Sequence, residues 1–301
     1  MPLTLPFVRV GKPLRHHSLT IFPLFTDVEP VVDYRLSDDA ITAEALVVTE
    51  VSEQGSVPEL LVDNRGDKPV LFLEGEMLVG AKQDRVLNTS LLVAAGIKMK
   101  VPVSCVERGR WARRSLRFGS SPRSPSPSLR RSLKKSVSSS LRRMQRHTSD
   151  QGAVWRTVEE IHRSHRVTSQ TRALSDAYEQ TELRAEDFRQ RLRYEPGSRG
   201  LVAALGGRVV MLELYDRAET CARMWDRLLS GLVLEALSTP LAENPVEAEA
   251  VERLLAAAEE AAWEEVTTPG EGEEYRATLG GDPASALTCE GSLLHESVLV
   301  D

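Results

Sequence analysis

The sequence predicts an α+β protein with a β-rich N-terminal half, built as an antiparallel meander or sandwich, followed by helices and a β-hairpin. Short runs of Val, Ile and Leu separated by turn residues fill the first third of the chain and are typical of strands. Beyond residue 150 the apolar residues are spaced as in helices. Gly206-Gly207 then joins two apolar runs, as a tight hairpin with positive φ requires. Together these three features predict the fold class.

Strand-like segments occupy the region before residue 107. From Ile97 to Cys105 the odd-numbered residues are apolar, whereas Lys98, Lys100 and Ser104 alternate with them, so one face of this strand is expected in the core. Cys105 is therefore predicted to be a buried, inert thiol rather than a nucleophile. The expected strands are 44–51, 57–62, 69–79 and 97–106.

The second half of the chain mixes helices with strands. Pro196-Gly197 ends one helical pattern, and Asn244-Pro245 supplies a capping residue and a first-turn proline for another. Because strand-forming segments lie at both ends of the chain, we expect the C-terminal strands to complete the sheet system begun by the N-terminal half. The expected helices lie near 153–193, 218–237 and 246–265, and the expected strands near 201–214 and 274–300.

A basic segment divides the two halves. From Arg108 to Ser149 there are thirteen Lys or Arg and no acid, in a chain with net charge −6. Its Ser, Pro and Arg content offers little apolar area, so we expect a flexible, partly disordered insertion that folding does not need, with 119–140 as its core. A nucleic-acid arm or a phosphorylated Arg-Ser tract is the alternative. The expected division is a β-rich half over 1–111, this insertion over 112–149, and a remainder over 150–301 that completes one integrated domain.

Composition restricts the class of protein. A chain of 301 residues with 41% hydrophobic content can bury a substantial core. The net negative charge argues against nucleic acid as a partner, apart from a weak interaction of the basic insertion. Three dispersed cysteines without C-x-x-C predict neither a disulfide framework nor a cysteine zinc site, and fit a reducing compartment. No secretory signal and no apolar run of about eighteen residues is present, so we expect a soluble cytoplasmic protein without a membrane partner.

The stretch FLEGEMLVGAKQDR, residues 72–85, collects functional groups in an apolar setting. If 70–79 is one strand, Glu74 and Glu76 share a face and can converge on one cation or on a sugar hydroxyl pair. Gly75 and Gly80 indicate close approach of another backbone or a ligand. Charged and amide groups at the strand's end can meet phosphate or a polar edge, namely Lys82, Gln83, Asp84 and Arg85. The alternative is a rim of exposed salt bridges.

The stretch CVERGRW, residues 105–111, ends the next strand-like segment in a similar way. Glu107, Arg110 and Trp111 surround a flexible glycine, and arginine with tryptophan suits a phosphate joined to a flat base. A core tryptophan with arginines packed over it is the alternative. We predict that both stretches converge on one pocket, in which Glu74 and Glu76 are catalytic or metal-ligating and the other side chains bind the ligand: Lys82, Gln83, Arg85, Glu107, Arg110 and Trp111.

Other candidate motifs are weaker. Glu159, His162 and His165 have metal-compatible spacing on a predicted helix, but a solvated helical face is the favoured interpretation. His16-His17 and His295 are isolated in the sequence. Signatures of nucleophile-elbow hydrolases, P-loop NTPases and Rossmann dehydrogenases do not occur.

Four segments carry a family resemblance: FLEGEMLVGAKQDRVLNTSLLVAAG, VPVSCVERGRW, QGAVW and RGLVAALGGRVVMLELYD. They resemble the bacterial family of uncharacterised domains named for association with ADP-ribosylglycohydrolases and rhodanese-phosphatase proteins, over nearly the whole chain, with 119–140 departing from it. The resemblance implies a role in NAD or ADP-ribose metabolism and carries over no catalytic residue.

Two functions from different classes remain open. One is an enzyme, such as a hydrolase, that processes an NAD-derived or ADP-ribose-like phosphorylated metabolite, with a divalent metal as a candidate cofactor. The other is a non-catalytic module that senses such a ligand or binds a protein partner.

Overall fold

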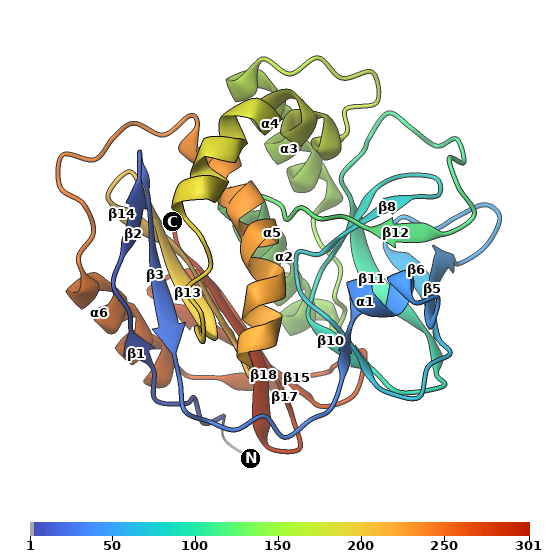
Figure 1. The fold of residues 1–301 in the computed structure, drawn as a ribbon. Helices are drawn as coiled ribbons and strands as arrows, with labels where there is room; N and C mark the ends of the chain where they lie inside the picture. The colour runs from blue at the N-terminus through green and yellow to red at the C-terminus, as the bar shows by residue number, and fades with distance from the viewer. Residues whose placement is uncertain (1–2) are drawn as a thin grey trace.

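Both ends of the chain contribute to one large antiparallel sheet (Figure 1). A computed structural model describes residues 3–301, and within this range nine strands form the sheet, in the order β1-β3-β13-β14-β18-β17-β16-β15 with β2 paired to β3. The expected strands of 44–106 lie outside this sheet, so the N-terminal contribution comes from residues 9–25 alone. The members are β1 (Arg9–Val10), β2 (Leu14–His16), β3 (Leu19–Phe25), β13 (Gly200–Leu205), β14 (Arg208–Tyr215), β15 (Glu264–Val266), β16 (Glu273–Leu279), β17 (Asp282–Cys289) and β18 (Ser292–Leu299).

The strands of 46–120 form a separate, nearly closed barrel-like layer in the described part of the chain (Figure 1). Alternating apolar side chains such as Val48, Leu87 and Val103 fill its interior. Its six-stranded sheet has the order β12 (Phe118–Ser120), β8 (Met77–Gly80), β9 (Arg85–Leu87), β11 (Lys98–Cys105), β6 (Glu59–Asn64) and β5 (Leu46–Glu50). A smaller sheet of β10 (Leu91–Val93), β7 (Val70–Phe72) and β4 (Arg35–Leu36), with helix α1 (Ser37–Thr42), lies beside it.

The helices of the second half form in the regions that the helical spacing predicted. They are α3 (Gln151–His165), α4 (Leu174–Arg191), α5 (Ala218–Ala236) and α6 (Ala248–Glu259). The last helix differs at both ends, because it begins after Glu247 without the predicted Asn244-Pro245 cap, and residues 264–266 form strand β15. Helix α5 buries Met224, Leu228 and Leu232 against the large sheet. Gly206 and Gly207 connect β13 to β14 with φ of 55° and 83°, which confirms the predicted hairpin and its reason. The α+β class is therefore confirmed.

The prediction of one strand over 69–79 was wrong. Strand β7 ends at Phe72, and the amide of Glu76 donates a hydrogen bond to the carbonyl of Leu73 at 3.0 Å, which closes a turn before β8 begins. Gly75 makes this turn possible, because its φ is +86° and a Cβ there would lie 2.7 Å from the Arg130 side chain. Glu74 and Glu76 consequently do not share the face of a strand.

The expectation of a flexible basic insertion was also wrong. Residues Pro127–Met144 form helix α2, with the side chain of Ser126 capping the amide of Leu129 and proline in the first turn. This helix lies in the middle of the molecule and contacts β17, β18, α3 and α5 (Figure 1).

Two features of α2 explain its order. Leu129, Leu133, Val137 and Leu141 recur every four residues and are buried along one face. The basic residues Arg130 and Lys134 are buried as well, because acidic side chains of other elements pair with them. Composition predicted disorder here because the segment has few apolar residues, but four of them at the right spacing are enough to form one buried helix face.

Among residues 3–301, no helix combines the length and the apolar character that a bilayer crossing needs.

Candidate functional site

A buried arginine lies at one end of the barrel. Arg85 is in β9, on the same strand face as Leu87, which packs in the barrel core. The exposed fraction of Arg85 is 0%, and its Nη1 donates to Oε1 of Gln83 at 2.9 Å. Cys105 of the paired strand β11 donates its thiol to the same Gln83 oxygen at 3.2 Å. We call Lys82, Gln83, Arg85, Cys105 and Trp111 the barrel-mouth cluster.

Part of the Arg85 guanidinium has no partner. Its Nε and Nη2 are buried without a hydrogen-bond partner among residues 3–301, and the same is true of Oε2 of the nearby Glu50. An unpartnered buried donor loses the full solvation of that group, about 1–3 kcal/mol and more when the group is charged. Buried groups of this kind are rare in native structures and concentrate at functional sites. An anionic ligand at this position would supply the missing acceptors.

Trp111 forms the outer edge of the barrel-mouth cluster. The Arg85 guanidinium lies 5.9 Å and the Lys82 ammonium 5.2 Å from the centroid of the indole ring. Trp111 is 45% exposed, so it is not the core tryptophan of the alternative interpretation. Gly55 lets another loop approach this edge, because its φ is +80° and a Cβ there would lie 3.2 Å from both Trp111 and Lys82. The indole is therefore held in place and still accessible from solvent.

Glu107 and Arg110 form hydrogen bonds with the loop of residues 80–84, which leads into the barrel-mouth cluster. Arg110 lies 2.6 Å from Glu107 and 3.3 Å from Asp84, and it donates to the carbonyl of Ala81 at 2.7 Å. Burial raises the pKa of Glu107, but the hydrogen bonds from Arg110 and from the amide of Asp84 lower it overall. This carboxylate is therefore ionised, and its oxygens already accept hydrogen bonds from these two residues. These contacts connect Glu107 and Arg110 to residues 80–84, the loop that carries Lys82 and Gln83.

The structure does not bring Glu74 or Glu76 to the barrel mouth. Glu76 accepts hydrogen bonds from the amide of Leu73, at 2.8 Å, and from the Ser37 hydroxyl, and burial raises its pKa to about 7. Glu74 instead lies 3.2 Å from Lys134 and 3.6 Å from Arg276. The eight predicted residues thus divide into six that gather at or beneath the barrel mouth and two that turn toward other parts of the fold.

Glu74 belongs to a buried ionic network between α2, the turn that follows β7 and the large sheet. Arg130 of α2 lies 2.8 Å from Glu213, and His295 bridges Glu213 at 2.8 Å and Ser90 at 2.7 Å. Burial raises the pKa of Glu213, but Arg130 and His295 lower it to about 2 overall. Burial also lowers the pKa of Lys134 to about 8, against the opposing effect of Glu74.

Sequence reasoning missed most of this network. His295 looked isolated, and the acids that pair with Arg130 and Lys134 are distant along the chain. The spacing of Arg130 and Lys134, four residues apart in a run with leucines at the same interval, was the available signal. The network links the barrel to the sheet and explains why α2 is ordered.

The remaining candidates have structural explanations. Glu159 pairs with Arg108 and Arg172 at 3.1 Å each, and Nε2 of His162 lies 2.9 Å from the carbonyl of Ala173. Cys105 is buried, and burial raises the pKa of its thiol against the opposing effect of Arg85, as expected for an inert cysteine.

The fold and its contacts define an α+β protein in which a buried helix joins a barrel to a large antiparallel sheet, with a buried arginine at the barrel mouth whose Nε and Nη2 lack hydrogen-bond partners among residues 3–301. The chain belongs to the ARPP-1 family, since the model of the ARG and Rhodanese-Phosphatase-superfamily-associated Protein domain matches residues 7–299. No curated protein and no solved structure matches the chain.

Proposed function

We propose that this protein binds a small phosphorylated, nucleotide-like metabolite at the barrel mouth, of the NAD-derived or ADP-ribose class. The buried guanidinium of Arg85, whose Nε and Nη2 find no hydrogen-bond partner within residues 3–301, carries the proposal. Phosphate oxygens can accept both hydrogen bonds at once, which suits the planar donors of arginine. Lys82 adds a second cation and Trp111 an accessible ring face for a base.

Binding is proposed here rather than turnover. A catalytic acid or base has to reach the reacting atom of the ligand. Of the acids beside the barrel-mouth cluster, Glu107 and Asp84 are held by Arg110, and Glu50 accepts a hydrogen bond from the amide of Lys82 at 3.2 Å. Glu74 and Glu76 have partners elsewhere. A sensing module needs only complementarity to its ligand, and the charges and the exposed indole of the barrel-mouth cluster support this class of function. A cytoplasmic location is part of the proposal, because the three cysteines are free as in a reducing compartment.

Titration calorimetry with ADP-ribose, NAD, ADP and inorganic phosphate, each with and without Mg²⁺, tests the proposal. We expect Arg85→Met to weaken binding of every phosphorylated ligand by roughly tenfold or more, as loss of charge-assisted hydrogen bonds does. Trp111→Ala should weaken ADP-ribose and leave inorganic phosphate unchanged. Lys98→Ala, an exposed cation on β11 of the same barrel, is the matched control. Equal affinities of the wild type and Arg85→Met would contradict the proposal, and product formation in the same mixtures would show that the site is catalytic.

A further inference from the structure

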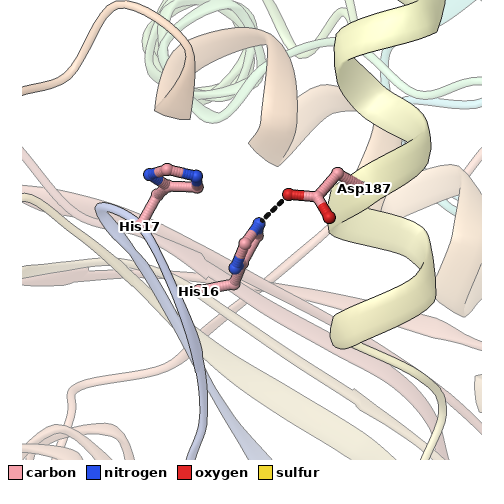
Figure 2. Close-up of side chains that lie close together, drawn as sticks. All are labelled: His16, His17 and Asp187. Carbon is pink, nitrogen blue, oxygen red and sulfur yellow. Dashed lines mark hydrogen bonds and ion pairs between the residues drawn. The ribbon is translucent and has the colours of Figure 1, made fainter.

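Two histidines that looked isolated in the sequence lie beside an aspartate of a distant helix (Figure 2). His16 ends β2, His17 follows it in the turn to β3, and Asp187 lies on α4. Nε2 of His16 is 2.6 Å from Oδ2 of Asp187. One nitrogen of each imidazole and one carboxylate oxygen all lie within 4.8 Å of one another. The three side chains therefore offer ligand atoms around a single point.

The backbone of His17 is in the left-handed region. His17 and Ser18 form the two-residue turn of the β2–β3 hairpin, and the φ of His17 is +49°. Glycine is the common residue at the first position of such a turn when φ is positive. Histidine adopts this conformation more readily than most other non-glycine residues, and it directs the His17 side chain from the turn.

Aromatic contacts adjoin both rings, of which that of His16 is half-buried and that of His17 is exposed. The Phe188 ring contacts His16 edge-on at a centroid distance of 4.7 Å and lies 5.6 Å from the His17 ring. The Ser18 hydroxyl donates to the carbonyl of Ala236 at 3.0 Å, which fixes the turn against α5. These aromatic and backbone contacts do not involve the imidazole nitrogen atoms, whereas Nε2 of His16 lies against Asp187.

A cavity of about 450 Å³ opens next to the cluster. His17 and Asp187 line it, together with Arg184, Leu237 and Thr239. An ion held by the three side chains would consequently keep a coordination position that water or a small ligand could reach from this cavity.

We propose that His16, His17 and Asp187 form a binding site for a divalent transition-metal ion of the Zn²⁺ class. Imidazole nitrogens select such ions, whereas Mg²⁺ and Ca²⁺ prefer sites made of oxygen ligands. Three protein ligands with a further open position are the arrangement of zinc sites that bind water or substrate. The proposal does not depend on the function of the barrel mouth, because it rests on other elements of the fold.

Metal binding to the full chain, prepared without a polyhistidine tag and stripped with a chelator, tests this site. We expect one equivalent of Co²⁺ to give the visible absorption of a nitrogen-ligated site, and Zn²⁺ to displace it. His17→Gly and Asp187→Asn should each weaken Zn²⁺ affinity by roughly tenfold or more. Glu179→Gln, which removes an exposed carboxylate from the same helix, should change nothing.

The His17→Gly variant separates metal binding from folding. Glycine suits the φ of this position, so the variant should fold with an unchanged or higher melting temperature in the absence of metal. Absence of Co²⁺ absorption in the folded wild type would overturn the proposal. So would an unchanged Zn²⁺ affinity in both His17→Gly and Asp187→Asn, which would leave His16 and Asp187 as an ordinary ion pair.

Discussion

Arg130 of α2 lies 2.8 Å from Glu213 of β14, and each side chain is only 1% exposed. The pair connects the basic helix in the middle of the molecule to the large sheet. Breaking a buried ion pair from one side leaves the other charge without a partner, which is strongly destabilising. This contact is therefore expected to determine much of the stability of the fold.

Arg130→Met should lower the free energy of unfolding by about 3–5 kcal/mol. The double variant Arg130→Met with Glu213→Gln should recover part of this loss, because no unpaired buried charge remains. Urea denaturation of the two single variants and the double variant measures the coupling. Arg131→Ala is the control, since Arg131 is part-exposed and its ion pair with Asp282 should contribute at most about 1 kcal/mol. Strictly additive losses would show that Arg130 and Glu213 act independently.

Leu133→Ala in α2 should destabilise the protein by about 2–5 kcal/mol, because this side chain is buried and its removal leaves a cavity. Lys135→Ala, two residues further on the exposed side of the helix, should stay within about 0.5 kcal/mol of the wild type. Thermal denaturation followed by circular dichroism compares the two. Deletion of 119–140 should prevent folding, and a folded deletion variant would mean that α2 is not part of the core.

Glu76 should make the protein less stable as the pH rises from about 4.5 to about 7. Burial raises the pKa of its carboxyl to about 7 in the folded chain, against 4.5 as its ordinary value. In that window the folded state holds a proton that the unfolded state has released, so rising pH favours unfolding. Glu76→Gln removes the titrating group and should flatten this part of the stability profile.

Urea midpoints of the wild type and Glu76→Gln at pH 5 and pH 8 test this expectation. Glutamine can still accept the hydrogen bond from the amide of Leu73, so the two proteins should differ less at pH 5 than at pH 8. A difference that does not change with pH would assign the effect to packing instead of ionisation.

Arg85→Met should leave the melting temperature of the ligand-free protein unchanged or raise it. A buried guanidinium with two unpartnered nitrogens opposes folding, and an apolar side chain of similar length avoids that penalty. Ligands that bind the folded state raise its stability, so ADP-ribose should increase the melting temperature of the wild type and not of the variant. A large loss of stability in the ligand-free variant would instead make Arg85 a structural residue. Trp111→Phe keeps an aromatic ring beside Arg85, and its melting temperature with and without ADP-ribose is compared with that of Arg85→Met.

Alternation and helical spacing predicted β5, β6, β11, β13, β14, β16 to β18 and the helices α3 to α6, because they reflect which face of each element is buried. Charged groups beside glycine at the ends of two strand-like segments led to the prediction that residues 82–85 and 107–111 lie together. Arg85 pairs directly with Cys105 in neighbouring strands, so the segments that flank this pair end at the same edge of the sheet. Local pattern carries this information because strand pairing places adjacent strand ends side by side.

The tertiary structure decided the order of α2, the separation of Glu74 from the barrel mouth, and the meeting of His16 with Asp187. In each case the partner is remote in the chain: Glu213 for Arg130, Lys134 for Glu74, and helix α4 for the β2–β3 turn. A charged residue is predicted to be exposed unless its counter-charge is known, because burying an unpaired charge is strongly unfavourable. Only the packed fold brings these counter-charges together, which is why composition predicted flexibility where the structure has a central helix.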